Sequence, residues 1–106
     1  MITLHNLKYE ATSEPYDFLI DKRTPVGNMF WRGDGSHRAL ACASYDKWAR
    51  KTAEPAYIKM IEVMTNVYLK YGRLRLFCHC VPLQCHGETI KTLIKEKLDD
   101  FKYGDV

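Results

Sequence analysis

A stretch of twenty residues, Leu74–Leu93, constrains the fold of this chain more than any other part of it. Alternating apolar residues predict a strand over its first five positions, and an apolar period of about 3.6 predicts a helix from Gly87 onwards. This junction between a strand and a helix is the place in an open α/β sheet where ligands bind. Three of the four cysteines and two of the four histidines lie within nine residues at the junction, namely Cys78, His79, Cys80, Cys85 and His86.

Two further strands are expected before this junction. Ile2 and Leu4 alternate with polar residues and predict a short first strand, and Tyr16–Ile20 is an apolar and aromatic run suited to a second one. Between residues 21 and 36, glycine and proline punctuate a polar stretch, which predicts a loop.

Three helices are also expected. Ser36 is a suitable N-cap for a first helix over residues 37–50. Pro55 fits the first turn of a second helix, which Gly72 would end, and the third would run from residue 87 to about residue 101. The positions expected to face the core are Ala41, Tyr45 and Trp48, then Tyr57, Ile61, Met64 and Tyr68, and finally Ile90, Leu93, Ile94, Leu98 and Phe101.

The order strand, strand, helix, helix, strand, helix predicts a small α/β sandwich, with a partly parallel sheet of about three or more strands and three helices. A chain of 106 residues is expected to form one domain, residues 1–106, whose core needs neither disulfides nor metal to fold. We recognise neither a signal peptide nor a run that would span a membrane. We therefore expect a cytoplasmic protein, in which clustered thiols stay reduced and serve metal or thiolate chemistry.

The cysteine stretch can be interpreted as a metal site. Cys78 and Cys80 are two residues apart on a strand and point to one face, and a short loop returns Cys85 to them. Together with His86 they would complete a tetrahedral zinc site. However, Cys85 and His86 diverge by about 100° at a helix start, and the usual zinc spacing of roughly two to four residues between cysteines is missing. We expect no metal, with zinc at Cys78, Cys80, Cys85 and His86 as the alternative.

A second interpretation is thiolate chemistry, with Cys85, His86 and Glu88 as catalytic residues. Cys85 would begin the final helix, whose dipole and free amides lower a thiol pKa. His86 would serve as a base, and Glu88 lies in the same first turn. The alternative is core packing, because free cysteine is among the most buried residue types. Core packing is preferred for Cys42 and Cys78.

A third constellation is the cationic, glycine-rich loop after the second strand. Glycine amides and a helix start suit phosphate or another anion, and arginine adds bidentate recognition. The alternative is a solvated loop in which Gly27 and Asn28 make a turn with positive φ. Because this loop follows a strand as the cysteine segment does, we expect both to meet at one edge of the sheet. The expected ligand-binding residues are Lys22, Arg23, Gly27, Asn28 and Arg38, with Phe30 and Trp31 beside them.

The two segments together resemble a known family. Thr24–Phe30 carries a Gly-Asn pair, and Cys78–Gly87 reads Cys-His-Cys-Val-Pro-Leu-Gln-Cys-His-Gly. These motifs are similar to the Gly-Asn-Pro-Phe and Cys-Trp-Cys-x-Pro-x-x-Cys-His-Gly motifs of the uncharacterised family numbered 4326 among the domains of unknown function, which is common in phages and bacteria. The resemblance spans Tyr16–Leu93 and implies no established activity. The family also has an Ile-Gly-Arg motif, which corresponds to Ile20-Asp21-Lys22 here, so Asp21 and Lys22 depart from it. Met29 stands where the family has proline, and His79 stands where it has tryptophan.

These features predict a phage-type accessory domain that binds a phosphate-bearing ligand, a nucleotide or nucleotide derivative, between the Gly-Asn loop and the Cys-His-Gly helix start. The sequence does not decide whether it also catalyses a reaction. The alternative is a module that binds or inhibits a host protein, with structural or zinc-bound cysteines. Direct nucleic-acid binding is not expected, because the net charge is only +3 and acidic residues interrupt the lysines of the last helix. For a phage protein, the cytoplasm would be that of the host cell.

Overall fold

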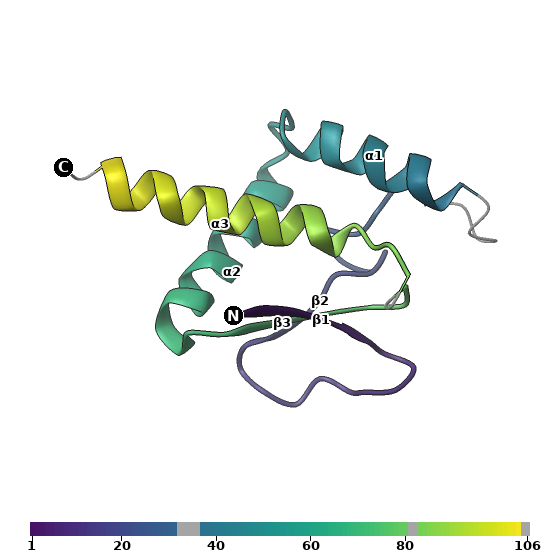
Figure 1. Cartoon of the computed structure of the whole chain (residues 1–106), viewed down its shortest axis with the longest axis horizontal. Coiled ribbons are helices and arrows are strands. Elements are labelled where there is room, and N and C mark those ends of the chain that lie inside the picture. Colours follow the sequence, from purple (N-terminus) through teal and green to yellow (C-terminus); the bar gives the residue numbers. More distant parts are fainter. Residues whose placement is uncertain (32–36, 81–82, 105–106) are drawn as a thin grey trace.

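The computed structural model describes residues 1–31, 37–80 and 83–104, with side chains as far as Asp99. In this part of the chain, three helices accompany a three-stranded sheet in the order β1-β3-β2, and both strand pairs are parallel (Figure 1). The predicted α/β class is therefore confirmed. In chain order the elements are β1 (Ile2–Asn6), β2 (Asp17–Leu19), α1 (Arg38–Ala49), α2 (Pro55–Tyr71), β3 (Leu74–Cys78) and α3 (Gly87–Gly104).

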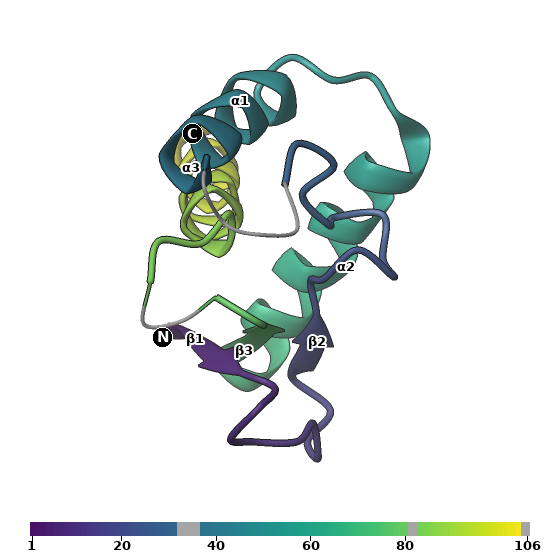
Figure 2. The ribbon, with the colours of Figure 1, turned by 90° about the vertical axis from the view of Figure 1, so that its right-hand side faces the viewer.

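One face of the sheet packs against the helices. Ile2 pairs with Leu74 and Leu4 with Leu76, so alternate residues of both strands point to the same face. The helices lie on one side of the sheet, with α1 farther from it than α3, and the loop joining β1 to β2 passes on the other side (Figures 1 and 2). The buried core between sheet and helices includes Ile2, Leu74, Leu76 and Cys78 together with Tyr57, Ile61, Met64, Ile90 and Ile94.

Helix α2 follows its sequence signals closely. Pro55 stands in its first turn, where the missing amide hydrogen costs nothing. Gly72 ends the helix with a φ of 72° and donates its amide hydrogen to the Tyr68 carbonyl oxygen at 2.8 Å. Ile61 and Met64 are buried, which confirms the predicted inward face.

The other two helices differ from the expectations at their ends. Helix α1 is shorter by one residue at each end, and its expected N-cap, Ser36, lies outside the described residues. Helix α3 continues to Gly104, beyond the expected end. Ile90 and Ile94 are buried as predicted, whereas the side chain of Phe101 lies outside the described part of the chain.

An ion pair fastens the short strand β2 to β3. Arg75 donates from Nε and Nη2 to the carboxylate of Asp17, at 2.8 and 3.1 Å, and the Asp17 side chain has no exposed surface. The amides of Ser13 and Glu14 donate to the same carboxylate, at 2.8 and 3.0 Å. Burial raises the pKa of Asp17, but these hydrogen bonds outweigh it together and hold the pKa below its usual range.

The carboxyl ends of β2 and β3 lie side by side. Leu19 pairs with Phe77 in parallel register, and Ile20 continues the pairing by donating its amide hydrogen to the Phe77 carbonyl oxygen at 2.9 Å. The loop after β2 and the segment after β3 therefore leave the sheet at the same edge.

Candidate functional site

A pocket of about 440 Å³ opens at the edge where the two segments leave the sheet. Both segments contribute to its wall, which confirms the prediction that they meet. Its volume is in the range of small-molecule sites. It is lined by Asp21, Lys22, Arg23, Asn28 and Trp31 after β2, and by Cys78, His79, Cys80 and His86 from the cysteine segment.

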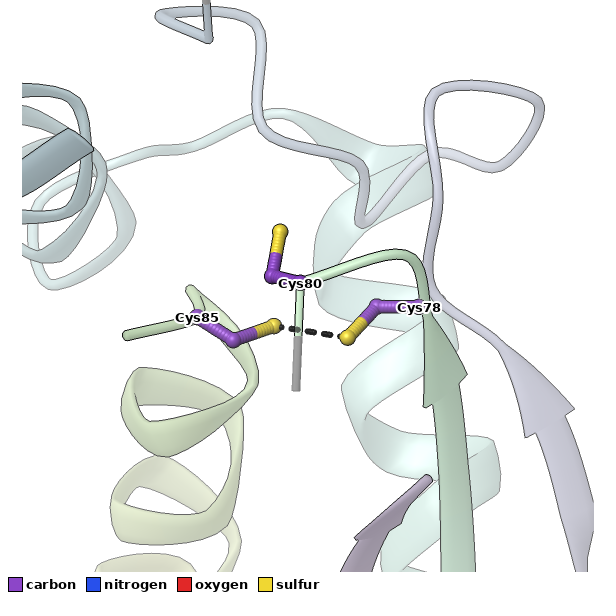
Figure 3. Close-up of side chains that lie close together, drawn as sticks. All are labelled: Cys78, Cys80 and Cys85. Atoms are coloured by element: carbon purple, nitrogen blue, oxygen red, sulfur yellow. Dashed lines mark hydrogen bonds between the residues drawn. The ribbon is translucent and has the colours of Figure 1, made fainter. Parts of the chain in front are cut away.

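Beside this pocket, Cys78, Cys80 and Cys85 bring their three sulfur atoms within 4.8 Å of one another. The Sγ atoms of Cys78 and Cys85 face each other at 3.0 Å, whereas that of Cys80 points away from the line between them (Figure 3). None of these three cysteines forms a disulfide in the described part of the chain, and Cys78 and Cys85 are buried. The predicted burial of Cys42 and Cys78 is confirmed.

The thiols of this cluster differ in acidity. The pKa of Cys80 is lowered, mainly by hydrogen bonds with Cys78 and Cys85. The charge and hydrogen bonding of Arg38 lower it further, whereas burial raises it. Hydrogen bonds with Cys78 and Cys80, followed by burial, raise the pKa of Cys85. The lowered pKa expected for Cys85 is therefore wrong in direction, because its sulfur lies in the protein interior between other sulfur atoms.

The imidazole of His86 lies between the Ile20 carbonyl oxygen and the Cys85 sulfur. Its Nε2 lies 2.6 Å from the carbonyl oxygen of Ile20, and since a carbonyl only accepts, Nε2 carries the hydrogen. The other ring nitrogen, Nδ1, lies 3.7 Å from the Cys85 sulfur, and the ring packs edge-on against Tyr45 at 5.0 Å. Burial lowers the pKa of His86, so the ring is neutral. Of the four alternative zinc ligands, the structure brings the three cysteines together and leaves His86 beside them.

The amides at the start of α3 already have acceptors within the chain. Gly87 donates to the Cys85 sulfur at 3.4 Å, Glu88 to the Cys85 carbonyl oxygen at 3.2 Å and Thr89 to the His86 carbonyl oxygen at 3.0 Å. The Glu88 side chain is exposed and lines a separate surface pocket, not the one beside β2. The three expected catalytic residues thus do not face one common space.

The carboxylate of Asp21 holds together a polar cluster that the sequence analysis did not single out. Arg23 donates to it from its backbone nitrogen, Nε and Nη2, at 3.1, 2.9 and 2.6 Å. The Nε2 atom of His79 lies 3.2 Å away. The hydrogen bonds from Arg23 are the main reason that the pKa of Asp21 is below its usual range. Arg23, an expected ligand-binding residue, is therefore partly engaged by an internal carboxylate.

Gly27 is required by close packing rather than by its φ angle. A Cβ at this position would lie 2.4 Å from the Asp21 carbonyl oxygen and 2.7 Å from the Lys22 Cα. Among the described residues, positive φ is confined to Gly72, so a positive-φ turn at Gly27 is wrong. The loop folds back on its own beginning there, and only glycine fits.

Asn28 serves mainly to fasten the loop to α1. Its Nδ2 donates to the Ala41 carbonyl oxygen at 3.3 Å, and its Oδ1 accepts the amide hydrogen of Phe30 at 2.9 Å. The side chain is buried but lines the pocket. It therefore fixes the wall of the pocket whether or not it also contacts a ligand.

Arg38 connects the two sides of the site. Its guanidinium lies 4.6 Å from the ring centroid of Trp31 and donates from Nη1 to the Gln84 carbonyl oxygen at 3.1 Å. The Lys22 ammonium lies 3.4 Å from the Trp31 carbonyl oxygen. Two of the expected cations, Lys22 and Arg38, thus gather around one tryptophan.

Residues 5–96 match the family described as Domain of unknown function (DUF4326), which covers well over half of the chain. The chain belongs to this family. No curated protein and no solved structure was found to match it.

In this DUF4326 chain, the matched residues include both segments that form the pocket. Asp21, one of the matched residues, places a carboxylate in the pocket wall. The sequence signal for the cluster around the Asp21 carboxylate is an aspartate directly after a predicted strand, with an arginine two residues later. Aspartate side chains commonly accept hydrogen bonds from backbone amides two residues on.

None of the described helices is long and apolar enough to cross a membrane.

Proposed function

We propose that this DUF4326 domain binds a small anionic molecule in the pocket between the loop after β2 and the cysteine segment. Phosphate-bearing compounds such as nucleotides are the first candidates. The observation that carries the proposal is the pocket itself, in which segments more than forty residues apart in sequence form the walls of one cavity of about 440 Å³. Concave sites of this size with a few convergent polar groups are typical of small-molecule binding.

The charges around the pocket favour an anion over a cation. Of the described residues that line it, Lys22 and Arg23 are cationic and Asp21 is anionic. Arg23 pairs with Asp21 through Nε and Nη2, so the carboxylate is neutralised and Nη1 lies outside the ion pair. Arg38, stacked on Trp31, adds another cation near the same wall. Cations in excess over carboxylates attract phosphate and carboxylate groups.

The ligand would be held by side chains rather than by the start of α3. The amides of residues 87–89 already have acceptors within the chain, so the helix start offers fewer free donors than the sequence suggested. The indole of Trp31 adds a flat apolar wall, on which the ring of a nucleobase packs well. A ligand with an anionic group and a flat ring therefore matches the lining better than inorganic phosphate alone.

Thermal denaturation with a panel of compounds tests the proposal. Inorganic phosphate, pyrophosphate, mononucleotides and dinucleotides are each added to the reduced protein, and at least one is expected to raise the melting temperature, because a ligand that binds only the folded state stabilises it. Lys22→Ala should reduce this shift. Lys97→Ala removes an exposed lysine about 15 Å along α3 from its start and should leave the shift unchanged.

Two results would contradict the proposal. One is a melting temperature that no compound in the panel changes. The other is a shift that Lys22→Ala and Lys97→Ala reduce equally, since this would show that the anion binds the general positive charge of the protein and not the pocket. In either case the alternative of a module that binds a host protein becomes the leading interpretation.

A further inference from the structure

Three sulfur atoms of the cysteine segment meet beside the pocket, and neither the fold nor the proposed ligand explains why. Cys78 ends β3, Cys80 follows two residues later, and Cys85 lies two residues before the first residue of α3. Their sulfur atoms lie within 4.8 Å of one another. Core packing accounts for one buried cysteine at a time but does not require three thiols at one point.

The spacing of the sulfur atoms is close to that of a thiolate metal centre. Two thiolates at about 2.3 Å from one tetrahedral zinc ion lie about 3.8 Å apart. Here the sulfur atoms of Cys78 and Cys85 lie 3.0 Å apart, and no pair in the cluster exceeds 4.8 Å. The Cys80 sulfur points away from the other two (Figure 3). A small widening of the first pair, together with a rotation of the Cys80 side chain, would bring all three sulfur atoms to one ion.

We propose that Cys78, Cys80 and Cys85 bind one zinc ion through three thiolates, with the fourth coordination position directed at the pocket. Cys78 and Cys80 line that pocket, so a water molecule or a ligand donor atom reaches an ion held between them. Three protein ligands and one open position are the arrangement of zinc sites that act on or bind small molecules, whereas structural zinc sites have four protein ligands.

The surroundings of the cluster suit bound thiolates. The Gly87 amide donates to the Cys85 sulfur at 3.4 Å, a contact that stabilises negative charge on sulfur and orients the ligand. The Arg38 side chain interacts with the Cys80 sulfur. Cys78 and Cys85 are at most 3% exposed, so thiolates there need a cation to compensate their charge. A divalent ion supplies it directly.

The ligand set favours zinc over an iron–sulfur cluster. Such clusters are generally held by four cysteines. Cys42, the remaining cysteine, is buried in α1 and does not belong to the group of three among the described residues. The Nε2 atom of His86 is engaged by the Ile20 carbonyl oxygen, and its Nδ1 lies 3.7 Å from the Cys85 sulfur. Among the described residues, His86 does not belong to the group whose ligand atoms all lie within 4.8 Å of one another. It supports Cys85 from the side without completing the site.

Native mass spectrometry of the full chain, purified under reducing conditions and supplied with ZnCl₂, tests the proposal. We expect one zinc ion per chain, released by a chelator with exposure of three alkylatable thiols. Cobalt(II) in place of zinc should give sulfur-to-metal charge-transfer absorption. Cys80→Ser, at the partly exposed position, should weaken zinc binding at least tenfold, and circular dichroism shows whether this variant is folded.

Two control variants decide which residues are ligands. Cys42→Ala and His86→Gln should both retain one zinc ion and the cobalt absorption. Loss of the ion in Cys42→Ala would overturn the open fourth position in favour of four cysteine ligands, and loss in folded His86→Gln would overturn the assignment of His86 as a supporting residue. A folded, reduced wild-type protein that takes up no zinc would overturn the whole proposal. None of these readouts depends on the pocket ligand, so the two proposals succeed or fail separately.

Discussion

His86 donates its Nε2 hydrogen to the carbonyl oxygen of Ile20 across 2.6 Å. This bond ties the start of α3 to the residue that follows β2, although the two are 66 positions apart in the sequence. It also fixes the orientation of the ring, so that Nδ1 faces the Cys85 sulfur. His86 is thus a connection between the two walls of the pocket.

Removing this connection should destabilise the fold. His86→Phe keeps most of the ring volume but leaves the Ile20 carbonyl oxygen without its donor, which we expect to lower the free energy of unfolding by about 1–3 kcal/mol. Urea denaturation of the reduced, metal-free protein measures it. His79→Phe, at a side chain that is 61% exposed, is the matched control and should cost clearly less. Equal losses of unfolding free energy in the two variants would show that the hydrogen bond to Ile20 contributes nothing to stability.

The Asp17–Arg75 ion pair should make stability depend on pH in acid. The folded-state pKa of Asp17 is lowered, so its contribution is complete above the unfolded pKa of about 3.9 and is lost as pH falls through the folded value. Asp17→Asn should cost about 1–3 kcal/mol at pH 7 and should flatten the decline of stability below about pH 5. Urea unfolding across this range measures both effects. Asp99→Asn, at an exposed position, should leave the curve unchanged.

The buried face of α2 allows a paired test on one helix. Ile61→Ala removes a side chain from the core and should lower the free energy of unfolding by about 2–5 kcal/mol. Ile58→Ala makes the same chemical change at a side chain that is 44% exposed, so its cost should be within about 1 kcal/mol. Urea denaturation of both variants gives the comparison. A loss near zero for Ile61→Ala would mean that the assigned face is incorrect.

Close packing at Gly27 predicts that no side chain is tolerated there. A methyl group would meet the backbone of Asp21 and Lys22, so Gly27→Ala should cost about 1–3 kcal/mol through forced backbone shifts. In a domain of about this size, 1 kcal/mol lowers the melting temperature by about 4–8 °C. Gly72→Asn is the comparison and should lower the melting temperature less than Gly27→Ala does. Asparagine tolerates the left-handed region better than most residues, and no atom lies within 4 Å of the added Cβ. A melting temperature unaffected by Gly27→Ala would contradict the contact.

Local signals in the sequence were sufficient for most of the fold. Pro55 and Gly72 mark the ends of α2 through properties of single residues, and the alternation of Leu74 and Leu76 marks β3. That the loop after β2 and the cysteine segment share one edge follows from parallel strands, and was also predictable.

The chemistry of the site was less predictable, because it depends on distances between segments. The metal-site interpretation already brought Cys85 to Cys78 and Cys80, but the thiolate interpretation took the Cys85 pKa from its place at a helix start alone. The sequence does not show that the neighbouring sulfur atoms and burial raise this pKa. The sequence presents Arg23 as a cation available to a ligand, and it does not show that the Arg23 guanidinium donates hydrogen bonds to the Asp21 carboxylate. Helix position is local information, whereas charge state depends on neighbours that only the tertiary structure supplies.

The central place of β3 sets the order in which the molecule can assemble. Strands β1 and β2 each pair with β3 and lie at opposite edges of the described sheet, although both are synthesised before it. Until residues 74–78 have left the ribosome, both earlier strands lack their partner and expose unpaired backbone groups. Sheet formation therefore waits until β3 has been synthesised, and the strand that completes the sheet is also the one that delivers Cys78 to the pocket.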